Sequence, residues 1–408
     1  MRLHRNLCLA VVEGIFHIFN ENQYADKVVY QMLKRDKRWG SADRKFIAET
    51  TYDIVRWQRL YSSIAEVNMP FTRENIWRLL AVWLVLKGYR LPDWPQFEGT
   101  PNRRIKGKFD EYSKQRAIIQ SIPDWMDQMG ESELGVKVWD KELEAQNQKA
   151  KVILRTNTLK TNRNDLQLKL ESEGIESIAL KSHPYALELV ERANVFQTEA
   201  FKLGWFEVQD ASSQLVADYL EVAPGMRVID ACAGAGGKTL HLASNMENKG
   251  QLLALDLYKS KLNQLKTRAK RNGAHNIETR IIDSTKVIKK LKESADRLLI
   301  DAPCSGIGVL KRNPDAKWKL TPEFVENIKN TQFEILSNYT KMLKPGGLMV
   351  YATCSVLPSE NQNQIQRFLK TEIGQEFELL KEQSLFAHKC GYDGFYMAQL
   401  KRKKPAES

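Results

Sequence analysis

From about Gly204 onward, short apolar runs alternate with longer segments of helical periodicity, and this alternation narrows the possible folds more than any other feature. Five runs resemble buried strands: Arg227–Asp230, Gln251–Asp256, Glu278–Ile282, Arg297–Asp301 and Gly347–Tyr351. Helical patterns separate them at Gln214–Leu220, Thr239–Asn245, Lys259–Arg271, Pro322–Met342 and Glu360–Phe368. Strands that alternate with helices form βαβ units with parallel strands. The sequence therefore predicts an α/β fold with a doubly wound parallel sheet, followed by a hairpin near Phe395–Leu400.

The chain ahead of this sheet divides into two further regions. Residues 1–120 have apolar positions at helical spacing and little glycine, which predicts an all-helical domain. Ser41 is expected to be the N-cap of one of its helices, and Leu91–Gly107 is expected to be a loop. Residues 121–203 combine a helix near 124–147, a helix at Asn164–Glu173 and short strands, which predicts a small α+β module. We therefore expect three domains, at 1–120, 121–203 and 204–408.

Composition limits the partners and the compartment. The 408 residues carry a formal net charge of +12, which favours a polyanionic partner such as nucleic acid; a generally basic enzyme is the alternative. The five cysteines form no CxxC pair, so neither a metal site nor a disulfide framework is indicated. The sequence has no apolar run as long as a membrane span. We expect a cytoplasmic monomer without a bound metal.

A glycine-rich turn follows the first strand of the predicted sheet. Its residues are Cys232, Ala233, Gly234, Ala235, Gly236, Gly237 and Lys238. The turn lacks the spacing of a phosphate-binding P-loop, because Cys232 stands where that motif needs its first glycine. It also lacks the GxGxxG spacing of dinucleotide sites, because residue 239 is threonine. A close approach of the backbone to some other ligand at a helix N-terminus remains.

Aspartates at successive strand ends indicate what that ligand is. Asp256 lies where a carboxylate can accept both hydroxyls of a ribose, and Asp283 could bind an adenine amino group. With Asp230 and Asp301 they form a series of four. Any one of them could simply cap a helix. The whole set predicts an adenosyl ligand without phosphates, S-adenosyl-L-methionine.

Two cysteines follow strands of the same sheet, Cys304 in Asp-Ala-Pro-Cys-Ser-Gly and Cys354 in Ala-Thr-Cys-Ser. Cys8, Cys232 and Cys390 have the more ordinary interpretation of small packing residues. At a sheet edge, a cation such as Lys238 is expected to activate either of the first two thiols. A thiolate beside a methyl donor fits methylation of a pyrimidine at C5, because addition to C6 makes C5 nucleophilic and a nearby carboxyl group stabilises the adduct. The residues alone do not decide which thiol attacks.

Together these motifs resemble those of the RNA (cytosine-5) methyltransferases of the Sun/RsmB type. The resemblance covers residues 120–400 and includes Val208–Gln214, Gly308–Asp315 and Asp393–Tyr396. It implies a Rossmann-like class I methyltransferase domain in which Cys354 is the nucleophile and Cys304 assists release, with Asp301 as a further catalytic residue. It also implies that the 232–238 turn contacts the cofactor together with Asp256, Asp283 and Asp301. Ala235 replaces the proline that is usual in the family.

The front of the chain resembles the NusB-like RNA-binding domain of the ribosomal RNA members of this family, and residues 121–203 resemble its RRM-like module. The resemblance implies RNA, specifically 16S rRNA, as the partner. Two alternatives stay open: a tRNA cytosine-5 methyltransferase, and a non-catalytic RNA-binding or ribosome-assembly factor. The second is disfavoured because a binding protein does not need both Cys304 and Cys354.

Overall fold

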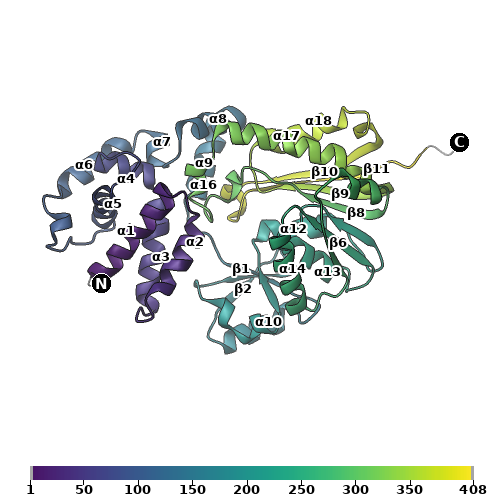
Figure 1. The fold of residues 1–408 in the computed structure, drawn as a ribbon, viewed down its shortest axis with the longest axis horizontal. Coiled ribbons are helices and arrows are strands. Elements are labelled where there is room, and N and C mark those ends of the chain that lie inside the picture. Colours follow the sequence, from purple (N-terminus) through teal and green to yellow (C-terminus); the bar gives the residue numbers. More distant parts are fainter. Residues whose placement is uncertain (1–2, 406–408) are drawn as a thin grey trace. The chain divides into compact units, whose positions relative to one another are not determined.

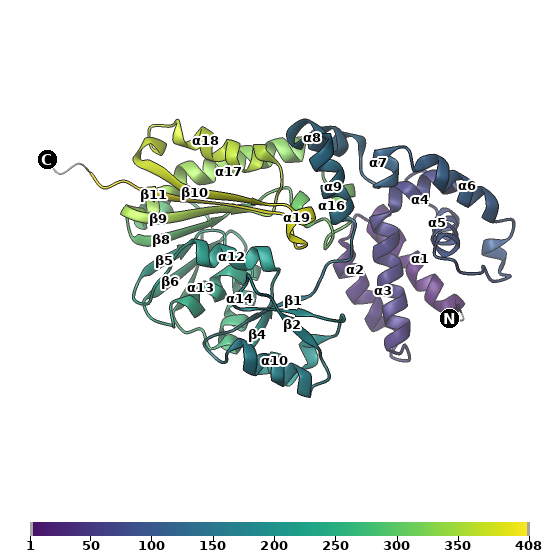
Figure 2. The ribbon, with the colours of Figure 1, turned by 180° about the vertical axis from the view of Figure 1, so that it is seen from behind.

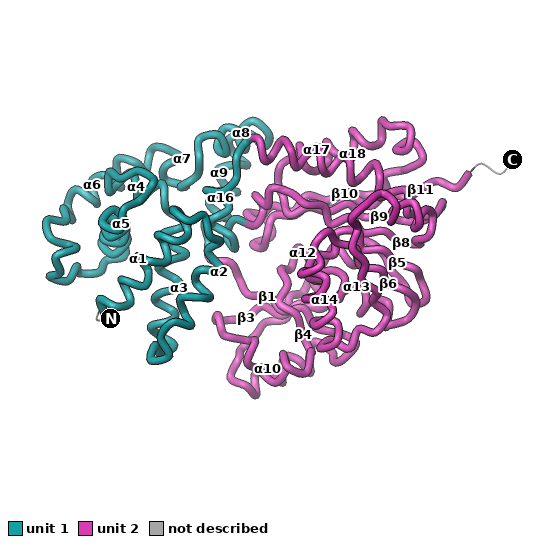
Figure 3. Tube along the Cα trace, in the orientation of Figure 1, with its two compact units in different colours: residues 1–148, 310–322 teal, residues 149–309, 323–408 magenta. Residues whose placement is uncertain are grey.

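The computed structural model describes residues 3–405, which form two compact units. The first, here called the helical unit, contains the chain up to residue 148 and residues 310–322; the second, the sheet unit, contains residues 149–309 and the chain from 323 onward (Figure 3). Within residues 3–405, no helix combines the length and apolar character needed to cross a membrane. The three-domain division at 1–120, 121–203 and 204–408 stays a prediction.

The helical unit is built around α5 (Arg73–Leu86), most of whose side chains are buried. The other helices of its first 148 residues are α1 (Arg5–Asn20), α2 (Ala25–Arg35), α3 (Ser41–Arg56), α4 (Gln58–Ala65), α6 (Asn102–Tyr112), α7 (Arg116–Ile119), α8 (Asp124–Leu134) and α9 (Val136–Gln146). This confirms an all-helical front end.

Three local predictions in the helical unit are wrong. Ser41 is the first residue of α3 and not its N-cap; that position is Gly40, whose N–H donates to Asp43 Oδ2 at 3.1 Å. The predicted loop Leu91–Gly107 contains the start of α6. The single helix expected near 124–147 is broken at Gly135, where φ is 76° and the chain must leave the helical conformation.

Residues 310–322 belong to the helical unit although they follow the Cys304 motif in the chain. They contain the short helix α16 (Ala316–Lys319). The buried Lys317 donates from Nζ to the carbonyl of Arg56 at 2.8 Å, and Trp318 donates from Nε1 to the carbonyl of Val55 at 2.7 Å. Asp315 accepts the N–H of Ala25, the first residue of α2. The sequence did not predict this insertion.

The sheet unit begins with a small antiparallel sheet, in the order β2-β3-β1-β4. Its strands are β1 (Ile153–Thr156), β2 (Ser177–Ala179), β3 (Ala186–Leu189) and β4 (Phe206–Val208), with helices α10 (Arg163–Ser172) and α11 (Glu199–Lys202). Leu154, Leu166, Leu170 and Phe206 are fully buried between the sheet and these helices. The predicted α+β module is therefore present.

The large sheet has the order β10-β11-β9-β8-β5-β6-β7. Its strands are β5 (Arg227–Asp230), β6 (Gln251–Asp256), β7 (Ile277–Ile281), β8 (Ala295–Asp301), β9 (Leu343–Thr353), β10 (Phe377–Leu385) and β11 (Phe395–Arg402). β5 to β9 pair in parallel, and β11 pairs antiparallel with both β9 and β10. This confirms the predicted parallel sheet and its final hairpin.

Helices cover both faces of this sheet, because apolar side chains alternate along its strands. Val228 packs toward α12 (Ala211–Tyr219), α13 (Gly237–Asn245) and α14 (Lys259–Asn272). Ile229 packs toward α15 (Thr285–Lys290), α17 (Pro322–Tyr339) and α18 (Gln362–Leu369). Figures 1 and 2 show α17 and α18 on one side of the sheet and α12, α13 and α14 on the other. The fold is a Rossmann-like doubly wound sheet, with the carboxyl ends of its parallel strands at one edge.

Candidate active site

A cavity of about 490 Å³ lies at the carboxyl ends of β5, β6, β8 and β9. Ten residues that the sequence singled out line it: Cys232, Ala233, Gly234, Ala235, Gly237, Lys238, Asp256, Asp301, Cys304 and Cys354. Gln209, Ser213, Tyr258 and Tyr339 complete much of the remaining wall. The carboxyl ends of these strands thus bring together the glycine turn, two of the aspartates and both thiols.

The glycine turn between β5 and α13 requires two positive φ angles, at Gly234 (56°) and Gly236 (87°). Gly236 contributes to packing and does not line the cavity, since a Cβ there would come within 2.1 Å of Leu265 on α14. The N–H of Gly234 donates to Asp256 Oδ2 at 2.8 Å. The end of β6 therefore holds the turn directly.

Two arginines that the sequence analysis missed hold carbonyls of the same turn. Arg155 on β1 donates to the carbonyl of Gly237 at 2.6 Å and to Gln209 Oε1. Arg268 on α14 donates to the carbonyl of Ala235 at 2.6 Å. Burial lowers the pKa of Arg155 to about 10, which still leaves it protonated near neutral pH. The available signal was an arginine directly after the apolar run Val152–Leu154, within a predicted strand.

The aspartates have different surroundings. Asp256 also accepts the N–H of Tyr258 at 2.8 Å, so both of its oxygens hold backbone and keep further lone pairs toward the cavity. Asp230 is buried below the cavity and accepts from Thr239 Oγ1 at 2.7 Å, and burial raises its pKa to about 7. Asp283 is exposed and does not line the cavity, although its neighbour Ile282 does. An adenine contact of Asp283 stays a prediction.

Lys238 and Asp301 form an ion pair, with Nζ and Oδ2 separated by 2.7 Å. Burial alone would lower the pKa of Lys238, but the Asp301 carboxylate outweighs it and the pKa is raised. Lys238 is therefore a fixed cation in the cavity wall, and its charge also interacts with Cys354.

The two thiols are in direct contact, with Cys304 Sγ and Cys354 Sγ 3.3 Å apart. The hydrogen bond with Cys354 and burial together raise the pKa of Cys304 well above its usual value. Our expectation that a neighbouring cation activates either thiol is therefore wrong for Cys304. The raised pKa favours the protonated form of Cys304, whereas the thiol of Cys354 interacts with the cation Lys238.

A buried glutamate, Glu360, connects the turns that carry both thiols. Its Oε2 accepts the N–H of Ser305 at 2.7 Å and Gln332 Nε2 at 3.1 Å. Its Oε1 accepts the hydroxyls of Ser305 and Ser355, the latter at 2.6 Å. Each serine directly follows one of the cysteines. Sequence reasoning missed Glu360, because an acidic residue at the start of a helix is usually explained by its favourable interaction with the helix dipole.

Two further motifs of the resemblance pack behind the Cys354 turn. Gly308 donates to the carbonyl of Cys354 at 3.0 Å, and Gly394 donates to the carbonyl of Gly308 at 2.7 Å. A Cβ on Gly308 would lie 2.4 Å from the carbonyl oxygen of Gly394, so only glycine fits there. These residues support the position of the thiol and do not enter the cavity lining.

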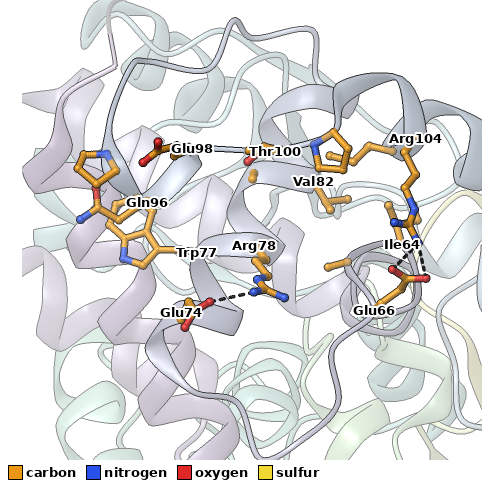
Figure 4. Close-up of a pocket in the computed structure, with 16 residues that line it drawn as sticks. Ile64, Glu66, Glu74, Trp77, Arg78, Val82, Gln96, Glu98, Thr100 and Arg104 are labelled. Carbon is orange, nitrogen blue, oxygen red and sulfur yellow. Dashed lines mark hydrogen bonds and ion pairs between the residues drawn. The ribbon is translucent and has the colours of Figure 1, made fainter.

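The helical unit has a cavity of its own, of about 630 Å³ (Figure 4). Four of its five charged residues form two ion pairs, Glu66 with Arg104 and Glu74 with Arg78, each at 2.8 Å; the fifth is Glu98. Trp77 and Val82 contribute apolar wall. Its lining contains neither a cysteine nor a histidine.

Comparison with protein families gives two matches. Residues 217–401 match the model of the 16S rRNA methyltransferase RsmB/F, and residues 122–196 match the ferredoxin-like domain of RsmF/B-like methyltransferases.

Curated relatives extend this likeness over nearly the whole chain. The probable ribosomal RNA small subunit methyltransferase B of Synechocystis is 34% identical, over 94% of this chain and 97% of the relative. The corresponding Bacillus subtilis protein is 31% identical, over 76% and 72%. That of Yersinia enterocolitica is 36% identical, over 64% of this chain and 62% of its own length.

Solved structures agree with the fold. The crystal structure of PH0851 has a TM-score of 0.84 at 24% identity, over 98% of this chain and 100% of that one. A methyltransferase homolog from Pyrococcus horikoshii has a TM-score of 0.63 at 25% identity, over 70% and 97%. NSun6 from Pyrococcus horikoshii with SFG has a TM-score of 0.65 at 20% identity, over 70% and 100%.

Proposed function

Because this chain belongs to the RsmB/F family of 16S rRNA methyltransferases, we propose that it transfers a methyl group from S-adenosyl-L-methionine to C5 of a cytosine in 16S rRNA. The observation that carries the proposal is the pair of thiols, 3.3 Å apart, in the wall of the cavity that also contains the glycine turn. One thiol has a reason to keep its proton and the other lies near a fixed cation. A binding protein has no use for that arrangement.

The residues present fit the proposed cofactor. The glycine turn allows close approach of the backbone, and Asp256 can accept ribose hydroxyls. Lys238, the cation that a phosphate would need, is already neutralised by Asp301. This favours an adenosyl ligand without phosphates. The cofactor, when bound, supplies an electrophilic methyl group. Cys232, Ala233, Ala235, Gly237 and Lys238 would line its site.

The thiols then have separate tasks. The Cys354 thiolate adds to C6 of the cytosine and forms an S–C6 bond, which makes C5 nucleophilic toward the methyl group. After C5 has gained the methyl group, with S-adenosylhomocysteine as the leaving group, a base removes the C5 proton, the S–C6 bond breaks, and Cys354 leaves as a thiolate. Cys304 assists this release. Asp301 lines the same cavity. Its carboxyl group is assigned the task of stabilising the adduct that the cytosine forms with Cys354.

The target base must leave its stack to reach Cys354, because the thiol attacks perpendicular to the ring plane. The substrate is accordingly a cytosine in a loop, or one that is flipped out of a helix on binding.

The test is incubation of the purified chain with labelled S-adenosyl-L-methionine and 16S rRNA, followed by mapping of 5-methylcytosine. We expect Cys354→Ala to abolish methyl transfer and Cys304→Ala to accumulate a covalent protein–RNA adduct. The control is Cys390→Ala, which changes a cysteine of the same unit outside the cavity lining. It is expected to retain methyl transfer and to accumulate no adduct. No transfer to any RNA by the unaltered chain would refute the proposed reaction. Loss of the adduct in Cys304→Ala would reverse the two roles.

A further inference from the structure

Much of the positive charge of the chain lies around one edge of the large sheet. Residues 259–292 contain eleven lysines and arginines and only two acidic residues, a net charge of +9 against +12 for the whole chain. This segment forms α14, the edge strand β7 and α15. α14 packs on one face of the sheet and α15 on the other, so the basic residues lie on both sides of the β7 edge.

Six lysines of this segment form what we call the lysine surface: Lys266 and Lys270 of α14, Lys286, Lys289 and Lys290 of α15, and Lys292 just after it. All six are exposed, and none forms an ion pair within residues 3–405. The arginines of α14 differ. Arg268 and Arg271 are half-buried and both bind the buried Glu207, so they serve the fold. The lysines have no such structural task.

Protection of an edge strand against aggregation does not explain this charge. Charged residues that protect an edge strand lie on the strand itself, and they can be of either sign. The only charged residues of β7 are Glu278 and Arg280, so the lysines of the flanking helices are not needed for protection. The opposite edge, β10, is protected by side chains of mixed sign, Glu378, Lys381 and Glu382. A surface of one sign on flanking helices instead matches a polyanion.

The helix that carries Lys266 and Lys270 of the lysine surface begins at the reaction cavity. α14 starts directly after Tyr258, which lines the cavity, and Lys261 in its first turn also lines it. β7 pairs with β6, whose last residue is Asp256. An RNA chain with one cytosine in the cavity continues beyond it in both directions, and its phosphates need partners outside the cavity.

We propose that the lysine surface binds phosphate groups of the RNA substrate next to the target cytosine; this rests on the function proposed above. The contacts are electrostatic and independent of sequence, so they contribute affinity and orientation and do not select the base. Each neutralised phosphate releases counterions, which makes the affinity depend on salt.

The test compares two variants that lose the same charge. K286Q/K289Q/K290Q/K292Q removes four lysines of the surface, and K341Q/K370Q/K401Q/K404Q removes four exposed lysines elsewhere in the sheet unit. Binding of protein-free 16S rRNA is measured between 50 and 300 mM KCl, together with kcat, KM for RNA and the Kd for S-adenosyl-L-methionine. In the first variant we expect the slope of log K against log[salt] to fall by about 3, at roughly 0.7–0.9 for each contact. Its KM for RNA should rise while its cofactor Kd and its kcat at saturating RNA stay unchanged.

The outcomes separate this proposal from the function on which it rests. An unchanged slope in the first variant, or an equal fall in both variants, overturns the lysine surface while methylation by the unaltered chain still stands. If the unaltered chain neither binds nor methylates RNA, the proposed function and the surface both fail. A fall confined to the first variant supports the surface.

Discussion

Glu360 offers the sharpest test of how the fold sets the distance between the thiols. Four donors point at its carboxylate: the N–H of Ser305, the amide of Gln332, and the hydroxyls of Ser305 and Ser355. In Glu360→Ala the two hydroxyls can turn toward each other, because their oxygens are only 3.5 Å apart. The N–H of Ser305 and the amide hydrogen of Gln332 that faces Glu360 cannot do so, while the other amide hydrogen of Gln332 keeps the carbonyl of Pro303 as its acceptor at 2.9 Å. Each buried donor without an acceptor costs about 1–3 kcal/mol, so Glu360→Ala should lower the free energy of unfolding by about 2–6 kcal/mol.

Glu360→Gln should be much milder. The amide oxygen can take the position of Oε2 and keep Ser305 N–H and Gln332, while its NH₂ donates to the serine hydroxyls, which also accept. What is lost is the charge on the acceptor, at roughly 1–2 kcal/mol in total. The two variants therefore separate the carboxylate's charge from its connectivity.

The assay measures the thiol geometry independently of any methylation. Diamide oxidises two adjacent thiols to a disulfide, and mass spectrometry follows the Cys304–Cys354 product. Glu360→Ala should slow this oxidation and Glu360→Gln should slow it less, because the turns that hold the two thiols together lose their shared acceptor only in the first variant. Gln399→Ala is the control: it removes a buried amide on β11, which donates to the carbonyl of Tyr219 and to Glu221, and should lower the unfolding temperature without slowing oxidation. Oxidation of Glu360→Ala at the original rate, or equal slowing in the control, would refute the reasoning.

Three further predictions concern the glycine turn and its surroundings. Burial raises the pKa of Asp230 to about 7 in the folded chain. The protonated carboxyl group therefore contributes its full stability below pH 4, and up to about 4 kcal/mol of the free energy of unfolding is lost as the pH rises through 7. Asp230→Asn should remove this part of the pH dependence in urea titrations from pH 4 to 8. Arg155→Met should weaken binding of S-adenosyl-L-methionine roughly tenfold in calorimetry, because the carbonyl of Gly237 loses its charged donor. Ala235→Pro should raise the free energy of unfolding by about 0.4–1 kcal/mol with unchanged cofactor affinity, since Ala235 N–H makes no hydrogen bond within the described residues and its φ is not positive; weaker binding would contradict this.

The large sheet was predictable because its strands carry their own local signals. β5 and β6 begin and end at the predicted residues, and β8 ends at the predicted Asp301. β9 starts earlier than predicted, at Leu343, because pairing with β8 extends the strand through Pro345 and two glycines that locally indicate a turn. The glycine turn and both thiols follow from these strand ends, so most of the site was predictable too.

Interactions between residues distant in the sequence were not predictable. Residues 310–322 return to the helical unit through bonds such as that of Lys317 to Arg56, 261 positions away. The exposure of Asp283 depends on the path of the chain after β7, which strand composition does not determine. The raised pKa of Cys304 depends on contact with a thiol 50 residues later in the chain.

Arg155 and Glu360 are buried charged residues that the sequence analysis missed, and they stabilise different halves of the site. Arg155 binds the carbonyl of Gly237 in the cofactor turn, and Glu360 binds the serines after the thiols. In the structure they share no hydrogen-bond partner. Independent sites have additive effects. Loss of Arg155 should therefore weaken cofactor binding and leave thiol oxidation unchanged, and loss of Glu360 should do the reverse. The fold would then control cofactor affinity and thiol reactivity separately, although both act on one cytosine.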